Sequence, residues 1–471
     1  MLDRAINWWT SNIPPWVLIA LIVHGTIMLT VAYLILLERK VASWVQDRLG
    51  PNRVGLGFGI IPILKDWKMN GFGQPLADGV KFILKEDYRP AGADKILFTI
   101  APGLMVLVII ISIAVLPWGG TRQTDRVIHI PPDSSSLRDS ASAQLAQGDV
   151  LVTDPVPLGG DNYRITYQYP FQIANLNIGV LYILAVLSLS VYGVVIGGWA
   201  SNNKYSFLGA LRATTNMISY EIPLGLAVLC IVVMYGTLDL NALVAKQCHN
   251  WVGIIPAWNV FSQPLAFIMF LICIHAEANR APFDTAEAEQ ELVGGYHTEY
   301  SAMRFALFFL GEYAGMITTS ALCVALFFGG WDFPGLRGAS GSPAVTTSLI
   351  ICILRAVVFF IKTIVIIFVF MWVRWSLPRF RFDQLMMLAW RGLIPISLGL
   401  LMMTAIVVFC FHGASYDQMG GSMALTLLGA NVLTGAFILL ASTMIPPAPA
   451  TNRRLTILGS RYSKTALPSP S

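Results

Sequence analysis

The chain has 471 residues, of which 55% are hydrophobic and only 12% charged, against about 25% charged residues in an average soluble domain. This composition excludes a soluble globular protein and indicates one built largely inside a membrane. The formal net charge of +5 comes from basic residues in the loops on one side of the predicted helix bundle. It therefore indicates orientation and predicts no nucleic-acid partner.

Apolar runs along the chain predict an all-α, polytopic transmembrane bundle of about nine spans, the fifth of them short. The first run has 22 residues and no small-residue cleavage site after it, so we expect a retained span and not a signal peptide. The predicted spans are Trp16–Leu37, Ile96–Leu116, Leu176–Gly198, Ala213–Tyr235, Pro264–Ile274, Phe305–Gly329, Leu349–Trp375, Leu393–Phe411 and Met423–Ile445.

The distribution of Lys and Arg predicts the orientation of this bundle. With the N-terminus outside, the loops at 38–95, 199–212, 276–304 and 374–392 and the C-terminal tail lie on one side and carry 22 of the 31 Lys and Arg residues. The positive-inside rule makes that side cytoplasmic and the N-terminus periplasmic.

The first cytoplasmic loop starts with a cluster of charge at the end of span one. Arg39 and Lys40 fit interfacial anchoring at a helix terminus, whereas Glu38 beside them needs another explanation. The turn Gly50-Pro51-Asn52 folds Arg48 back toward the same membrane face.

An amphipathic helix follows at about residues 74–85. Leu76, Val80, Ile83 and Leu84 share one face, while Asp78, Lys81 and Lys85 share the other. The helix is either a plain membrane-surface helix or the rim of an opening for a lipid-soluble molecule, with Asp78 and Lys81 facing the opening.

The outside loop at about 121–169 is polar and contains no catalytic constellation. Its second half alternates enough to predict a small hairpin. We interpret this loop as a docking or lineage-specific insertion.

Span four must begin near Ala213 to cross the hydrocarbon layer, which places Glu221 within the membrane. A carboxylate at that depth is usually functional or paired.

Residues 275–312 hold seven carboxylates between two apolar spans. Asp284 can cap a short helix with Glu287 at its N3 position, but such a capping box leaves the other acids unexplained. Glu287 and Glu291 repel each other on one helical face, and such clusters suit proton handling. The seven acids are Glu277, Asp284, Glu287, Glu289, Glu291, Glu299 and Glu312.

Span seven carries two cations on one helical face, Arg355 and Lys362. The least costly arrangement at this depth places the two cations opposite carboxylates such as Glu312 or Glu221 across the bundle interior. We expect Lys362 to serve a proton relay and Arg355 to be an outside anchor. The next loop returns Arg374, Arg379, Arg381 and Asp383 to the cytoplasmic face.

The six cysteines and six histidines have no spacing suited to zinc or to an iron–sulfur cluster, so any metal centre is expected in a partner.

Five long segments, in order, resemble one membrane subunit of bacterial respiratory complex I, the NADH:quinone oxidoreductase, namely the counterpart of mitochondrial subunit 1. The resemblance covers residues 16–412. The segments are ERKVASWVQDRLGPNRVG, QPLADGVKFILKED, GWASNNKYSFLGALRATTNMISYE, EANRAPFDTAEAEQELVGGYHTEYSAMRFALFFLGEY and PRFRFDQLM.

The resemblance implies a subunit without a redox centre in a proton-translocating enzyme of the bacterial inner membrane. Quinone would be the substrate, no cofactor would be bound covalently, and flavin and iron–sulfur clusters would lie in partner subunits. The partners would be other complex I subunits, at the junction of the peripheral and membrane arms, together with membrane lipids. A family domain at 1–412 would then be followed by an additional helix at 413–446 and a disordered cytoplasmic tail at 447–471.

The resemblance and the residue patterns together predict two groups of site residues. The predicted quinone-chamber residues are Arg39, Arg48, Asp78, Lys81, Arg280, Phe283, Arg379 and Arg381. The predicted proton-coupling residues are Glu38, Glu221, Glu277, Asp284, Glu287, Glu289, Glu291, Glu299, Glu312 and Lys362.

Two alternatives remain open at this point. One is the related subunit of a membrane-bound hydrogenase or formate hydrogenlyase, which would have similar helices and acids. The other is a free-standing ion-coupled transporter, although such proteins usually show inverted repeats, and no second half of this chain resembles the first.

Overall fold

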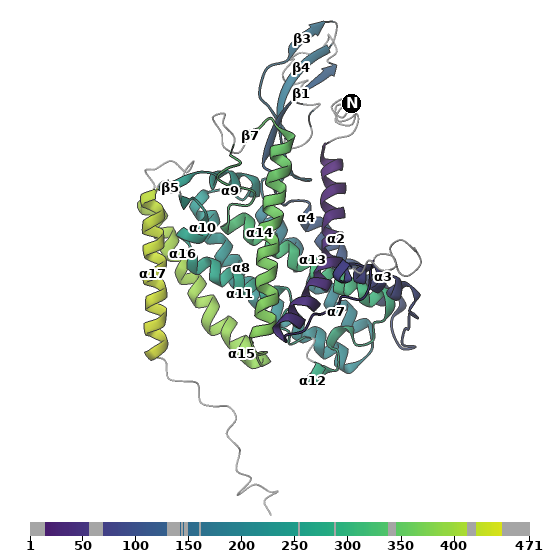
Figure 1. Cartoon of the computed structure of the whole chain (residues 1–471). Coiled ribbons are helices and arrows are strands. Elements are labelled where there is room, and N and C mark those ends of the chain that lie inside the picture. The colour runs from purple at the N-terminus through teal and green to yellow at the C-terminus, as the bar shows by residue number, and fades with distance from the viewer. Residues whose placement is uncertain are drawn as a thin grey trace, which may run out of the picture.

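The computed structural model describes residues 15–55, 69–129, 142, 145, 149–159, 162–252, 255–286, 289–337, 345–411 and 421–444. Within these ranges eight helices are long and apolar enough to cross a membrane, and a ninth apolar helix is shorter. The prediction of a polytopic helical membrane protein is confirmed (Figure 1).

The long helices follow one another along the chain with few interruptions. Two of the membrane-crossing units consist of consecutive segments, α6 with α7, and α15 with α16 through a π-helical turn at Leu388–Leu393. The helices are α2 (Pro15–Val45), α4 (Lys95–Ile113), α6 (Gly179–Ser188), α7 (Ser190–Ala200), α8 (Lys204–Tyr235), the short α11 (Pro264–Glu277), α13 (Ala302–Phe327), α14 (Leu349–Ser376), α15 (Phe382–Met387), α16 (Ile394–Cys410) and α17 (Gly421–Met444).

Polar residues at helix ends explain several of these bounds. The Asp94 carboxylate accepts hydrogen bonds from the backbone N–H groups of Ile96 and Leu97, which starts α4. Asn203 caps α8 in the same way, and Gly236, with φ of 64°, ends it. Helix α8 thus starts at Lys204, earlier than the predicted Ala213, because a good cap lies there.

The first helix also runs further than predicted. Helix α2 continues past Leu37 to Val45, so Glu38, Arg39 and Lys40 lie within the helix and not at its terminus. They lie about two turns before the end of α2, so the helix backbone fixes the direction in which each side chain leaves it.

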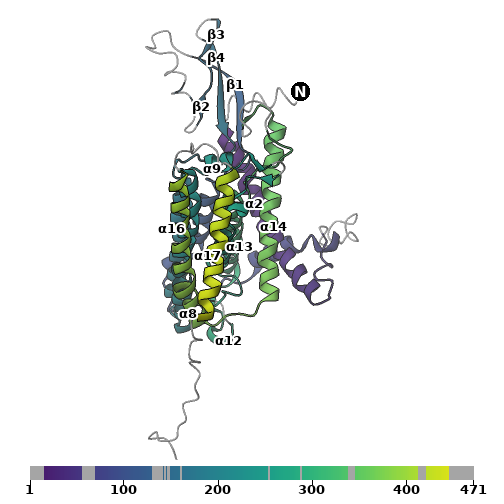
Figure 2. The same ribbon diagram turned by 90° about the vertical axis from the view of Figure 1, so that its left-hand side faces the viewer.

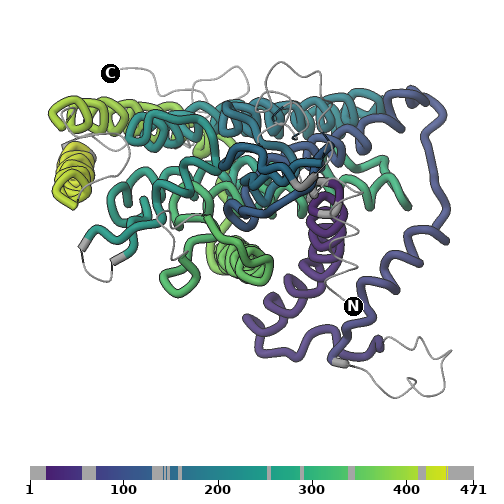
Figure 3. The backbone as a smooth tube through the Cα atoms, turned by 90° about the horizontal axis from the view of Figure 1, so that it is seen from above, coloured from purple at the N-terminus to yellow at the C-terminus, as the bar shows by residue number. Residues whose placement is uncertain are grey.

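The core is built around α13 and α8. Most of α13 is buried, and α2, α4, α11 and α14 pack against it. Helix α8 packs against α7, α11 and α16. Seen from above, α17 lies at one end of the bundle and the N-terminal segments lie at the other (Figure 3).

A small β-sheet stands above one end of the bundle, which we call the sheet end (Figure 1). Strands β1 (Thr121–His129) and β4 (Asn162–Pro170) pair antiparallel along nine residues. The flanking strands are β2 (Val150–Leu151), β3 (Val156–Gly159) and β7 (Val345–Thr346). The predicted hairpin is confirmed in the β3–β4 pair, whereas the longer β1–β4 ladder goes beyond the prediction.

A second, two-stranded sheet consists of β5 (Asn250–Val252) and β6 (Ile255–Pro256). The short helix α9 (Leu240–Lys246) precedes it, and the short helix α10 (Asn259–Ser262) follows it. Helix α12 (Glu289–Leu292), in the acidic loop, lies at the opposite end of the bundle from the larger sheet, which we call the loop end (Figure 1).

The predicted amphipathic helix forms as α3 (Gln74–Leu84), which contacts α2 and α13. Its apolar side chains Leu76, Ile83 and Leu84 are exposed. The segment that includes α3 stands out to one side of the bundle (Figure 2). Its placement at a membrane surface stays a prediction.

Two predictions about the C-terminal part have different outcomes. The additional helix forms as α17, which packs on α10, α11 and α16. The tail at 447–471 lies outside the described residues.

Candidate functional site

A cavity of about 790 Å³ lies between α2, α3, the first half of α13 and the end of α14. This volume falls in the range of small-molecule sites, and the wall is mostly aliphatic and aromatic with a few polar groups. The apolar wall includes Val31, Ile35, Phe82, Phe305, Phe309, Leu310 and Trp375. The polar groups include Glu38, Arg39, Gln74, Asp78, Tyr313 and Arg374.

An ion pair between α2 and α3 lines one side of the cavity. Arg39 Nη1 lies 2.8 Å from Asp78 Oδ2, and Gln74 Nε2 donates to Asp78 Oδ1 at 3.0 Å. Both charged residues are predicted chamber residues, and both line the cavity. The pair holds the protruding α3 against α2.

Glu38 lies at the inner side of the cavity with 7% of its surface exposed. Its carboxylate accepts hydrogen bonds from the Tyr313 hydroxyl and from the Arg374 guanidinium. Arg280 Nη1 lies 3.6 Å from Glu38 Oε2. Hydrogen bonds and nearby cations offset the cost of burying this carboxylate, so the residue that interfacial anchoring left unexplained has a built site.

Arg280 connects Glu38 to a second buried acid. Its Nη2 atom lies 4.0 Å from Glu312 Oε2, and its guanidinium stacks 4.1 Å above the Tyr313 ring. Glu312 also accepts a hydrogen bond from the Tyr296 hydroxyl at 2.5 Å. A single guanidinium thus lies between an acid that lines the cavity and an acid inside α13.

Beyond Glu312 a small cavity of about 30 Å³ is lined by Glu312 and Glu277, among others. Such a volume is large enough for one or two water molecules, and both carboxylates can bind them. Glu277 ends α11, and the charge of Glu221 on the adjacent α8 acts on it. Glu221 accepts a hydrogen bond from the Ser188 hydroxyl. We call Glu38, Arg280, Glu312, Glu277 and Glu221 the buried charge network; the first three are buried, and Glu277 and Glu221 are partly buried.

Asp284 is also buried, but it does not cap a helix as expected. Its Oδ2 atom accepts a hydrogen bond from Arg379 Nη2 at 2.9 Å, and no helix begins directly after it. Burial raises the pKa of Asp284 from 3.8 to about 6, against the lowering effect of Arg379. The capping role is wrong because residues 285 and 286 are not helical and the carboxylate instead binds the guanidinium of Arg379, from the loop after α14. Its proposed partner in the capping box, Glu287, lies outside the described residues.

The remaining acids of the loop lie near the start of α8. Glu291 forms an ion pair with Arg212, and its side chain is half exposed. Glu299 Oε1 accepts a hydrogen bond from Asn203 Nδ2 at 2.5 Å. Glu289 begins α12, whose backbone alone is described there. Glu291 and Glu299 therefore brace the acidic loop against α8.

The expected pairing of Arg355 and Lys362 with buried carboxylates is wrong. Lys362 Nζ donates to three backbone carbonyl oxygens, and Arg355 donates to the carbonyl of Leu336. Backbone carbonyls satisfy these cations because the irregular segment that follows α13 passes beside them and its carbonyls have no regular helical partners. Glu312 and Glu221 meanwhile have the partners described above.

The other predicted chamber residues divide into two groups. Phe283 is buried and packs edge-on against Tyr220 at a centroid distance of 5.3 Å. Arg48, Lys81 and Arg381 have exposed side chains and are not among the residues that line the cavity. The sequence thus locates the acids and the rim pair better than the surface cations.

Sequence reasoning missed the tyrosines of this site. Tyr313 and Tyr296 each donate a hydroxyl to one of the two acids that Arg280 joins. Tyr313 follows Glu312 directly, but neighbouring residues on a helix do not face each other, so the sequence gives no local signal for its bond to Glu38. Nothing local marks Tyr296, which comes from the short turn Gly295–His297.

Among the described residues, no group of three or more His, Cys, Asp or Glu side chains is placed to hold a metal ion. What the site offers is a large apolar cavity whose inner side is a protonatable acid connected to further buried acids. This arrangement can bind an apolar molecule and respond electrostatically to a change of charge on it.

Known proteins of one family are similar to this chain over most of its length. The sequence model of the NADH dehydrogenase family matches residues 18–405. The NADH-quinone oxidoreductase H subunit 1 of Cytophaga hutchinsonii is 41% identical over 387 residues, which cover 82% of this chain and 94% of that protein. The corresponding H subunit of Leptospira biflexa is 42% identical over 393 residues, which cover 83% of this chain and 94% of that protein. The H subunit of Flavobacterium johnsoniae is 40% identical over 390 residues, which cover 83% of this chain and 94% of that protein.

The matched region holds the cavity, the ion pair at its rim and the whole buried charge network, whereas α17 lies beyond it. The residues that the fold brings together thus fall within the stretch that the relatives share. The chain therefore belongs to the family of H subunits of the NADH-quinone oxidoreductases.

Proposed function

We propose that the cavity receives a quinone and that the buried charge network couples quinone reduction to proton translocation. The relatives are named as subunits of an NADH-quinone oxidoreductase, which makes a quinone the substrate class to consider. The observation that carries the proposal is the direct connection from the cavity through Glu38 and Arg280 to Glu312. An isoprenoid tail suits the aliphatic and aromatic wall, and a carbonyl-bearing headgroup suits the polar inner side.

The coupling follows from charge and burial. Reduction of a quinone to a quinol consumes two electrons and two protons, so it changes the charge and the proton demand around the headgroup. Glu38 faces the cavity and interacts with Arg280, whose other side faces Glu312. A change in charge at Glu38 alters the interaction of Arg280 with Glu312. The effect passes across the small cavity to Glu277, on which the charge of Glu221 acts in turn.

Several wider assignments belong to the same proposal. The electrons come from partner subunits that carry flavin and iron–sulfur clusters, and the chain sits at the junction of the peripheral and membrane arms. It is a multi-pass protein of the bacterial inner membrane with the acidic loop and the loop end on the cytoplasmic side. The Lys and Arg residues of the loops at 38–95 and 374–392 support this orientation.

The quinone-binding part is tested by narrowing the cavity. Ala32 lines the cavity from α2, so Ala32→Phe places a ring in the space that the quinone would occupy. In the assembled complex we expect quinone reduction to fall at least tenfold, while NADH oxidation with an artificial electron acceptor stays at the wild-type rate.

Leu29→Phe is the matched control, because Leu29 lies on the same helix but is 60% exposed and does not line the cavity. This variant should keep both activities. Wild-type quinone reduction in Ala32→Phe would show that the substrate does not use this cavity.

A further inference from the structure

The end of α13 far from Glu312 is held by a partly buried lysine of α14. Lys362 Nζ, from the middle of α14, donates to the carbonyl oxygens of Phe328 at 2.8 Å, Gly330 at 3.0 Å and Asp332 at 2.7 Å. A neutral amine has only two N–H donors, whereas an ammonium has three. The three acceptors therefore hold Lys362 in its charged form.

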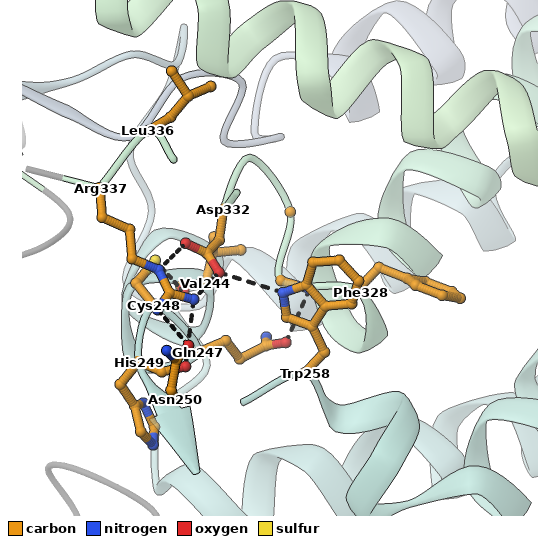
Figure 4. Close-up of polar contacts among 12 residues, drawn as sticks. Val244, Gln247, Cys248, His249, Asn250, Trp258, Phe328, Asp332, Leu336 and Arg337 are labelled. Atoms are coloured by element: carbon orange, nitrogen blue, oxygen red, sulfur yellow. Dashed lines mark hydrogen bonds and ion pairs between the residues drawn. The ribbon is translucent and has the colours of Figure 1, made fainter. Parts of the chain in front are cut away.

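An aromatic face and a neighbouring ion pair complete the site of this ammonium. Nζ lies 4.3 Å from the centre of the Trp258 ring, a geometry that stabilises a cation. Trp258 Nε1 also donates to Asp332 Oδ2 at 3.3 Å. Figure 4 shows Asp332 between Trp258 and Arg337.

The Asp332 carboxylate is already balanced by Arg337. Arg337 Nη2 lies 2.6 Å from Asp332 Oδ2, and Arg337 Nε donates to Asp332 Oδ1 at 2.8 Å, a bidentate pair (Figure 4). The lysine contacts the backbone carbonyl of Asp332 and the arginine takes both carboxylate oxygens, so Lys362, Asp332 and Arg337 together carry a net charge of +1.

A second cation, which is fully buried, lies two turns earlier on α14. Arg355 is 0% exposed, and its Nε and Nη2 atoms donate to the carbonyl of Leu336 at 3.1 and 2.9 Å. Its guanidinium lies 4.6 Å from the centre of the Trp331 ring. Arg337, Asp332, Lys362 and Arg355 together carry a net charge of +2 beneath the sheet end of the bundle.

Helix α13 joins this positive cluster to the acids. Glu312 lies in its first half, and Phe328 directly follows its last residue. At 1.5 Å per residue these two positions are about 24 Å apart along the helix axis. The residues between them, such as Ile317, Leu322 and Val324, are buried.

We propose that Lys362, supported by Arg355, forms an electrostatic barrier that keeps protons of the buried charge network from leaving through the sheet end of the bundle. A fixed positive charge among protein groups repels hydronium and other cations more strongly than it would in bulk water, as do the positive barriers of selective pores. This role replaces the relay expected for Lys362. It rests on the proposed function in one respect, namely that the acids of the network carry protons.

The test measures proton leak without turnover. The assembled complex with Lys362→Met is placed in liposomes that contain a pH-sensitive dye, a membrane potential and a pH gradient are imposed, and no NADH or quinone is added. We expect passive proton entry at least threefold faster than in the wild type. Lys362→Arg, which keeps the charge, should leak at the wild-type rate. Since no quinone is reduced in this assay, its result is independent of whether the large cavity binds quinone.

Assembly is checked by NADH oxidation with an artificial acceptor in isolated membranes. If Lys362→Met assembles and its leak equals that of the wild type, the barrier is refuted. If it does not assemble, Lys362→Gln takes its place, because an amide still donates to two of the carbonyls without a charge. A faster leak in Lys362→Gln supports the barrier. A wild-type leak in Lys362→Gln, or the failure of both neutral variants to assemble while Lys362→Arg assembles, shows that the lysine only fastens the end of α13 and overturns the proposal.

Discussion

Arg280 Nη1 lies 3.6 Å from Glu38 Oε2, so a residue of the acidic loop contacts an acid of the first helix. Both side chains are almost completely buried. Because Arg280 also faces Glu312, one side chain joins the wall of the cavity to the interior of α13. The acidic loop thus contacts the cavity through Glu38, although Arg280 itself does not line it.

Tyr313→Phe removes one hydroxyl from Glu38 and keeps the ring that lies beneath Arg280. The loss of one hydrogen bond to a charged group costs about 1.5–3 kcal/mol, which corresponds to roughly a tenfold or larger effect. We expect the rate of quinone reduction to fall about tenfold with little change in assembly. The measurement is steady-state quinone reduction alongside NADH oxidation with an artificial acceptor. An unchanged rate of quinone reduction would remove Tyr313 from the functional site.

Asp284→Asn tests the raised pKa of this buried carboxyl. Since burial raises its pKa from 3.8 to about 6, Asp284 takes up a proton as the pH falls from 7 to 5, where an ordinary aspartate stays ionised. Protonation removes the ionic partner of Arg379. We expect the wild-type rate of quinone reduction to change through a transition near pH 6 and the variant to lack it. The same transition in both proteins would assign it to another group.

Arg39 and Asp78 form a pair that is partly exposed to solvent, so its contribution should be small. Exposed ion pairs are worth up to about 1 kcal/mol, which limits the effect on the KM for quinone to about fivefold. Arg39→Ala, Asp78→Ala and the double variant form a mutant cycle. We expect the double variant to resemble each single one, because either change breaks the pair. Fully additive effects on KM would mean that the two residues act independently.

Glu221→Gln tests the far end of the buried charge network. Glutamine retains an acceptor for the Ser188 hydroxyl but cannot ionise. We expect proton pumping to fall at least fivefold while NADH oxidation with an artificial acceptor continues. Ser188→Ala is the control, since it removes the hydrogen bond and keeps the carboxylate, and it should pump more than Glu221→Gln. Normal proton pumping in Glu221→Gln would show that Glu221 is not part of the coupling and that the network extends only to Glu277.

The helix bundle is largely predictable because long apolar runs allow few alternatives in a membrane. Helix caps are harder to recognise from hydrophobicity, so α8 begins at Lys204 through Asn203, earlier than the apolar run alone suggests. The β1–β4 ladder escapes prediction because β1 is polar and its pairing partner is far away in the sequence.

The sequence predicts the composition of the candidate site better than the contacts within it. Buried acids such as Glu312 stand out in an apolar chain, since each needs a reason to be there. Their partners depend on tertiary contacts that no local pattern reveals, as with the Tyr296 hydroxyl on Glu312. The same limit explains the error for Lys362, whose three acceptors are backbone carbonyls that every sequence contains.

Arg280→Met is the most direct test of the coupling, because Arg280 is the residue that lies between Glu38 and Glu312. The assembled complex is reconstituted in liposomes, and the number of protons pumped per NADH oxidised by quinone is measured. We predict that this ratio falls to less than half of the wild-type value, while NADH oxidation with an artificial acceptor is unchanged. A wild-type ratio in an assembled Arg280→Met complex would contradict the coupling of the cavity to the acids through Arg280.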